Sequence, residues 1–219
     1  MVFDLEKEAL IASGIQGNDL MGACCERLDG LYREFRRQIR LPNDVSSRSK
    51  ALFDWLWRQK PNRYGLGSDF RLNHVIEAQT DQGTQVVGNC LGLTLLYNCL
   101  LRRLGIYAGA LNLENAFGKG PHVLTALKID EDLVDVENIL PHGFDYHGHI
   151  NNPSRASWGD QELVADIYLS MGNLLFDKGR FDEALENYDR AVDLNSEYEK
   201  ARINRAICLM ELENRGEVR

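Results

Sequence analysis

A stretch of almost unbroken apolar residues from Cys90 to Leu104 constrains the fold of this chain more than any other feature. Thr94, Asn98, Arg102 and Arg103 interrupt it, and Asn89 precedes it as a good N-cap residue. A helix that is apolar on nearly all sides belongs in the middle of a core, because no face of it suits water. We therefore predict a central buried helix that begins at Cys90, with the other elements packed around it.

Helical spacing also marks the residues before this stretch. Apolar residues recur every three or four positions over residues 18–39, and a second run of this kind covers residues 45–59. Residues 60–69 are rich in turn-forming types, and residues 70–79 fit a short amphipathic helix. We therefore predict a helical N-terminal part.

The periodicity changes after the central helix. Runs of β-type residues cover residues 106–114, 122–129 and 133–139, and the short turn between the last two predicts an antiparallel hairpin. A polar loop follows at residues 141–160, and we place a domain boundary within it. The sequence therefore predicts an α+β domain over residues 1–155, with a helical N-terminal part and an antiparallel sheet.

The end of the chain shows an internal similarity at a spacing of 34 residues, with Ala206 where Gly172 stood. Small residues such as Gly172, Ala184 and Ala191 alternate with bulky ones, so that two helices can approach closely. A helix–turn–helix period of about 34 residues is that of the tetratricopeptide repeat, and the segment resembles that family. We predict one full all-α repeat and the first helix of a second over residues 161–219. An ordinary helical hairpin is the alternative.

Cys90 is the candidate nucleophile, because it would occupy the first turn of the central helix. The helix dipole favours a thiolate there, and backbone N–H groups in the first turn have no helical acceptor, so they can stabilise an oxyanion. Gly88 and Gly92 flank Cys90 and leave room for a substrate, and Asn89 and Gln85 are candidate supporting groups for the oxyanion. A plain core role is the alternative, because cysteine is among the most buried residue types.

A thiol catalyst also needs a base and a group that orients the base. His122 opens one β-run and Asp135 lies on the next, so a sheet can bring both to the start of the helix. If the hairpin turn is tight, strict pairing puts His122 opposite Ile139 instead. Glu137 and Asn138 are then the alternatives for the orienting residue.

Three segments resemble the transglutaminase-like branch of the papain-like cysteine fold. Its cysteine helix is similar to GNCLGLTLLYNCLLRRLGI, and its histidine and aspartate strands are similar to HVLTALKI and LVDVEN. The whole chain resembles bacterial transglutaminase-like proteins with tetratricopeptide repeats. The resemblance implies acyl transfer from an amide or peptide bond: Cys90 attacks the carbonyl, His122 moves the proton, and Asp135 orients His122. Water or an amine can accept the acyl group, so a hydrolase and a transglutaminase both fit.

A non-catalytic scaffold is the alternative from another class. The cysteine domain would then be a retained fold, and the repeat would bind a peptide or a partner helix. We expect a peptide or protein substrate under the first hypothesis and a protein partner at the repeat under both.

A histidine-rich loop raises the question of a metal. His142, His147 and His149, with Asp145, are ligand types that suit a transition metal, but a metal site also needs fixed geometry. A loop that closes over the Cys90 cleft is the competing interpretation. We predict neither a metal nor a cofactor.

Composition narrows the partners and the location. A net charge of −8 provides no basic field for nucleic acid or anionic lipid. The N-terminus shows no secretory pattern, and the apolar stretch around Cys90 is too short to span a bilayer. Five scattered cysteines have no zinc-like spacing. We therefore predict a cytoplasmic protein with free thiols that binds neither nucleic acid nor membrane.

Overall fold

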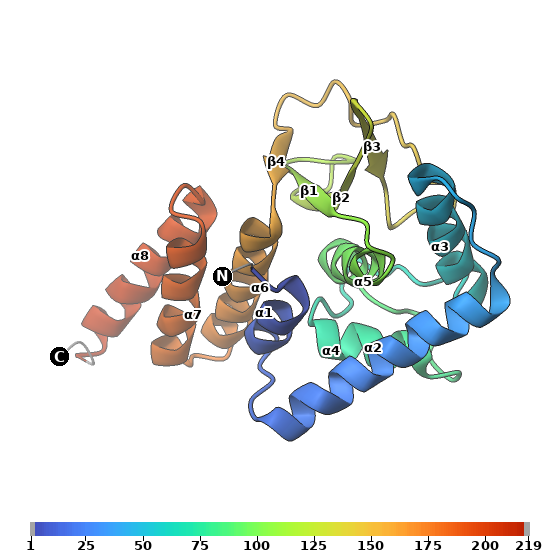
Figure 1. Ribbon diagram of the computed structural model, residues 1–219. Helices are drawn as coiled ribbons and strands as arrows, with labels where there is room; N and C mark the ends of the chain where they lie inside the picture. The colour runs from blue at the N-terminus through green and yellow to red at the C-terminus, as the bar shows by residue number, and fades with distance from the viewer. Residues whose placement is uncertain (1–2, 217–219) are drawn as a thin grey trace. The chain divides into compact units, whose positions relative to one another are not determined.

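The computed structural model describes residues 3–216 and divides the chain into two compact units. One unit runs from Ile15 to Gly159, and the other joins the chain up to Gly14 to the chain from Asp160 onward. Helices and one small antiparallel sheet make up the described elements (Figure 1), so the predicted α+β class is confirmed.

The Ile15–Gly159 unit combines helices with a four-stranded antiparallel sheet in the order β3-β2-β1-β4. Its elements are α2 (Asn18–Gln38), α3 (Val45–Gln59), α4 (Leu72–Thr80), α5 (Cys90–Arg103), β1 (Ala108–Leu113), β2 (His122–Ile129), β3 (Asp132–Val136) and β4 (Ala156–Trp158).

The core of this unit is built around α5. Every residue from Leu91 to Leu101 is buried, and the side chain of Asn89 caps the helix by accepting a hydrogen bond from the backbone N–H of Gly92 at 3.1 Å. Helices α2, α3 and α4 and strands β1 and β2 all contact α5, which lies against the sheet in Figure 1. The predicted central helix is confirmed, with Cys90 as its first residue.

The sheet departs from the sequence prediction in two places. The predicted β2–β3 hairpin is confirmed, with Ile129 opposite Asp132, but β3 ends at Val136 rather than at residue 139. The second difference is β4, which pairs with β1 inside a segment predicted to be a loop. A strand of three residues is too short to show a periodic pattern, so the sequence carried no signal for it.

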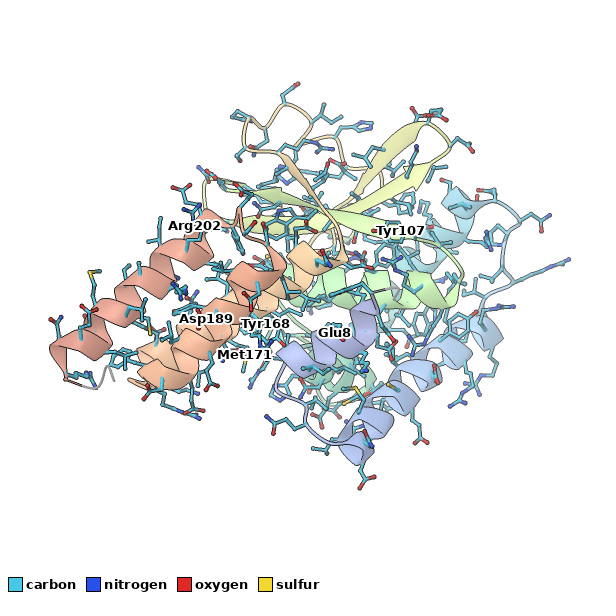
Figure 2. The ribbon with its side chains drawn as sticks, turned by 60° about the vertical axis from the view of Figure 1, so that its left-hand side comes forward. Glu8, Tyr107, Tyr168, Met171, Asp189 and Arg202 are labelled. Carbon is cyan, nitrogen blue, oxygen red and sulfur yellow. The ribbon has the colours of Figure 1, made fainter. Side chains whose placement is uncertain are left out.

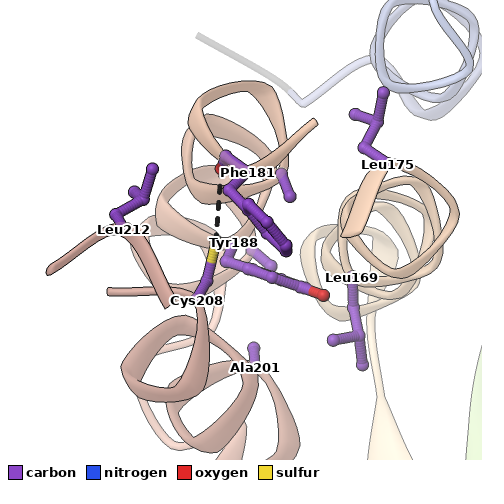
Figure 3. Close-up of a cluster of buried hydrophobic side chains, with 9 residues drawn as sticks. Leu169, Leu175, Phe181, Tyr188, Ala201, Cys208 and Leu212 are labelled. Carbon is purple, nitrogen blue, oxygen red and sulfur yellow. Dashed lines mark hydrogen bonds between the residues drawn. The ribbon is translucent and has the colours of Figure 1, made fainter. Parts of the chain in front are cut away.

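The other unit is helical and contains α1 (Leu5–Ala12), α6 (Asp160–Asp177), α7 (Phe181–Leu194) and α8 (Glu199–Asn214). Helix α6 packs on α7, and α7 packs on α8. A Cβ atom at Gly172 would lie 2.5 Å from the ring of Tyr188, so the small residue lets the bulky one pass between the helices. Figure 3 shows the buried cluster that results: Leu169, Leu175, Phe181, Ala184, Tyr188, Ala191, Ala201, Cys208 and Leu212.

Helix α1 contacts α6, although the two are far apart in the sequence. Figure 2 labels Glu8 of α1 and Tyr168 of α6. Burial raises the pKa of the Tyr168 phenol. The charge of Arg190 opposes this rise, and the charge of Glu8 adds to it. A Cβ atom at Gly14, just after α1, would lie 3.9 Å from the side chain of Met171. The start of the chain therefore belongs to the core of the C-terminal helices.

Candidate active site

Cys90 lies at the N-terminus of α5 and is only partly buried, whereas Cys99 on the same helix is buried. The backbone N–H of Asn89 donates to the carbonyl of Asp69 at 3.1 Å, which fixes the chain just before the helix begins. A thiol in this place faces the positive end of the helix dipole. The two cysteines therefore differ: Cys99 is a core residue, and Cys90 is partly accessible.

The glycines beside Cys90 serve packing rather than substrate access. A Cβ atom at Gly88 would lie 2.9 Å from the carbonyl oxygen of Asp69, and one at Gly92 would lie 2.6 Å from a methyl group of Val75. These glycines let α5 approach α4 and the segment before it closely.

His122 is the base candidate that the structure brings to Cys90. Its Nε2 lies 2.7 Å from Oε2 of Glu137, and Cys90 is near enough to raise the pKa of the ring. Burial acts to lower the pKa of His122, but the hydrogen bonds and charges of Cys90 and Glu137 outweigh it and raise the pKa to about 9. The imidazolium form is therefore favoured at neutral pH.

Glu137, rather than Asp135, is the carboxylate that holds His122. Strand β3 ends one residue before Glu137, whose backbone N–H donates to the carbonyl of Gly143 at 2.7 Å. The carboxylate is fully buried, and burial acts to raise its pKa. Hydrogen bonds with His122 and His149 outweigh that effect and lower the pKa of Glu137.

Asp135 and Asn138 have other partners. Asp135 accepts two hydrogen bonds from Arg155, at 2.5 and 2.6 Å, and lies opposite Ala126 in the sheet. The Asn138 amide donates to Oγ1 of Thr125 at 2.9 Å, within a buried polar network that ties β2 to α5. The predicted contact between Asp135 and His122 is thus wrong, because the guanidinium of Arg155 occupies the Asp135 carboxylate.

Gln85, a candidate supporting group for the oxyanion, lines a polar cavity of about 430 Å³ together with Gln59, Lys60 and Gln79.

Tyr64, which lies in the turn-rich segment before α4, is a residue of the site that the sequence analysis did not name. Burial raises the pKa of its phenol, and the nearby Cys90 and Glu137 add to the rise. No spacing pattern in the sequence points to Tyr64, because its position depends on the tertiary fold.

His149 is the second residue of the site that the sequence analysis did not assign to it. Its Nε2 lies 3.2 Å from the same Oε2 of Glu137, and its side chain is 5% exposed. The ring packs against Phe117 and Tyr146, with centroids at 4.8 and 5.1 Å. The other two histidines of the loop, His142 and His147, are exposed. The three loop histidines considered as metal ligands in the sequence analysis therefore do not form one site.

Residues 165–198 match the family model of the tetratricopeptide repeat. The match covers the full repeat predicted from the sequence, and this class of helical hairpin supports a protein-binding role for the C-terminal helices. It does not reach Cys90. Neither the comparison with curated proteins nor the comparison with solved structures found a match. Within the part of the chain that the structure describes, none of the helices has the length and apolar character to cross a membrane.

Proposed function

We propose that the protein binds a protein partner through its tetratricopeptide repeat. The observation that carries this proposal is the family match over residues 165–198, together with a groove of about 360 Å³ that the matched helices α6 and α7 form with α8. The Asn204 amide donates to Oδ1 of Asn173 at 2.8 Å at this groove. Apolar Phe176 and Ile207 stand beside the two amides. Such a surface suits an extended or helical peptide, because it offers polar groups for a backbone and apolar area for side chains.

The test is retention of a partner by the full chain and by two matched variants. Ile207→Asp places a charge in the groove, whereas Ile203→Asp changes the same residue type one turn away, at a pocket on other residues of α7 and α8. We expect quantitative pull-down to lose partners with Ile207→Asp and to keep them with Ile203→Asp. Equal retention by both variants would show that the groove is not the binding surface.

We propose a second function, cysteine-dependent acyl transfer, because His122 pairs with the buried Glu137 and lies near Cys90 at the start of α5. Cys90 attacks the carbonyl carbon as a thiolate, and the imidazolium of His122 then gives its proton to the leaving nitrogen. Glu137 orients the ring, and the backbone N–H of Cys90 faces the developing oxyanion. The likeness to transglutaminase-like proteins supports this proposal. Its substrate would be an amide or peptide bond, and the free thiols suit a reducing cytoplasm.

The acyl group on Cys90 can pass to water or to an amine. Hydrolysis is the simpler outcome, because water needs no binding site of its own.

The reactivity of the Cys90 thiol can be tested without a substrate. Cys24 and Cys25 are partly buried, as Cys90 is, so they are internal references for iodoacetamide alkylation at pH 7 in EDTA. We expect Cys90 to react at least about tenfold faster than either, and His122→Ala to remove that advantage. Equal rates for all three cysteines would refute the activated thiol.

A further inference from the structure

Three buried side chains of the Ile15–Gly159 unit direct their ligand atoms to one point. His122 and His149 each contribute a ring nitrogen and Glu137 contributes a carboxylate oxygen, and the three atoms all lie within 4.8 Å of one another. The two nitrogens lie 2.7 and 3.2 Å from the shared oxygen. We propose that these residues bind a divalent transition metal ion, Zn²⁺ above all, and that the bound ion blocks the Cys90 thiol chemistry.

The ligand set is the first argument for zinc. Two imidazoles and one carboxylate are a common set for this ion, which leaves a fourth position for water or another ligand. Tetrahedral ligands at about 2.1 Å from the ion lie about 3.4 Å from each other. The two nitrogen–oxygen distances of 2.7 and 3.2 Å are already close to this spacing, so an ion could replace the two hydrogen bonds after an adjustment of the side chains.

The second argument is that the surroundings already hold the ligands in place. Phe117 and Tyr146 pack on the His149 ring, and the carboxylate of Glu137 also accepts a contact from the backbone N–H of Ile139 at 3.4 Å. The side chains of the three ligands are at most 6% exposed. Rigid, buried ligands lose little conformational freedom when an ion binds, which is what raises affinity at metal sites.

The consequence for Cys90 follows from the atoms that the ion would occupy, and it rests on the proposed thiol function. Zn²⁺ would take the lone pair of His122 Nε2, whose proton leaves to solvent, and it would also take the carboxylate oxygen of Glu137. The 2.7 Å contact through which Glu137 orients the His122 ring would then be lost. The ion is therefore expected to inhibit, and its removal to restore, the reaction at Cys90.

The binding test uses the full chain after EDTA treatment and titration with Zn²⁺ in a calorimeter. The vicinal Cys24 and Cys25 can bind metal on their own, so both are changed to serine in every sample. We expect one ion per chain, with affinity reduced more than about 100-fold by His149→Ala. His147→Ala is the matched control, because His147 is an exposed histidine of the same loop, and it should bind as the parent does. Equal affinity in both variants would overturn the proposal.

A spectroscopic measurement keeps the test independent of how well the variants fold. Co²⁺ bound to the chain that carries Cys24→Ser and Cys25→Ser should show the visible bands of nitrogen and oxygen ligation. It should not show an intense thiolate-to-metal band in the near ultraviolet. Such a band would place the ion on cysteine sulfur and contradict the site.

Alkylation of Cys90 separates this proposal from the proposed function. If Cys90 is reactive in EDTA and Zn²⁺ protects it only in chains that keep His149, both hold. If Cys90 is reactive but no His149-dependent binding occurs, the metal site is wrong and the thiol function stands. If Zn²⁺ binds through His149 while Cys90 is unreactive in EDTA, the metal site stands and the thiol function is wrong.

Discussion

Two carboxylates two residues apart have different tasks in this protein, and substitutions at the residue scale should separate them. Glu137 faces His122, whereas Asp135 pairs with Arg155. We expect Glu137→Gln to slow alkylation of Cys90 at least about tenfold, because a neutral amide supports the imidazolium less well. Asp135→Asn should change that rate less than about twofold. Slow alkylation of Cys90 in Asp135→Asn with normal alkylation in Glu137→Gln would reverse the assignment.

The same pair shows how far the sequence can predict a site. Residue types and order predicted Cys90 and His122, because a helix start and a strand start are local features. Whether Asp135 or Glu137 reaches His122 depends on where β3 ends and on Arg155, which lies 20 residues away in the sequence. His149 was visible only as one of several loop histidines, because nothing local shows which of them is buried.

Asp166 of α6 gives a prediction about pH. Burial raises the pKa of its carboxyl, while a hydrogen bond from Tyr198 at 2.7 Å and the charge of Lys200 oppose the rise. A carboxyl with a raised pKa in the folded state contributes stability below its unfolded pKa and loses it as pH rises through the folded value. Asp166→Asn keeps an acceptor for Tyr198 but does not ionise. We expect denaturant melts to show the variant gaining stability relative to the parent as pH rises above about 4, the unfolded pKa of aspartate; a constant difference would contradict this.

At the scale of elements, the approach of α5 to α4 depends on Gly92. Its substitution by alanine would place Cβ 2.6 Å from a methyl group of Val75 and 3.0 Å from the carbonyl oxygen of Asp69. Overpacking of this kind costs about 1–3 kcal/mol. We expect Gly92→Ala to lower the free energy of unfolding by that amount, as measured by urea denaturation.

Gly22 is the matched control for this change. It also lies within a helix, α2, but a Cβ atom there would meet nothing within 4 Å. Alanine is favoured over glycine by about 0.8–1.0 kcal/mol inside a helix, so Gly22→Ala should stabilise the protein. Destabilisation by both substitutions would mean that close contact at Gly92 is not the cause.

Elements were predicted best where their packing pattern is local. The alternation of small and bulky residues predicted the α6–α7 hairpin, since Gly172 and Tyr188 meet as that pattern requires. The run around Cys90 predicted α5 because its apolar character is continuous. Strand β4 was missed, because its three residues are defined by pairing with β1 and not by their own sequence.

At the scale of the whole molecule, the chain combines a part that matches the tetratricopeptide repeat with a part in which a buried His122–Glu137 pair lies near the partly buried Cys90. The two proposed functions rest on different residues, in separate compact units. Each can therefore be removed by a substitution that leaves the other measurable: Ile207→Asp for partner binding and His122→Ala for the thiol.

No local sequence pattern predicts that α1 packs with the C-terminal helices α6, α7 and α8. This packing leads to a prediction about cooperative unfolding of these helices. Leu10 is fully buried, and its helix contacts α6. Leu10→Ala should cost about 2–5 kcal/mol through lost burial and a residual cavity. Hydrogen exchange followed by mass spectrometry should then show faster exchange in α6, α7 and α8, while α5 and β2 keep their protection. Leu20→Ala is the control, because Leu20 is 58% exposed, and it should leave exchange unchanged throughout. Faster exchange confined to α5 and β2 would show that α1 stabilises the other unit instead.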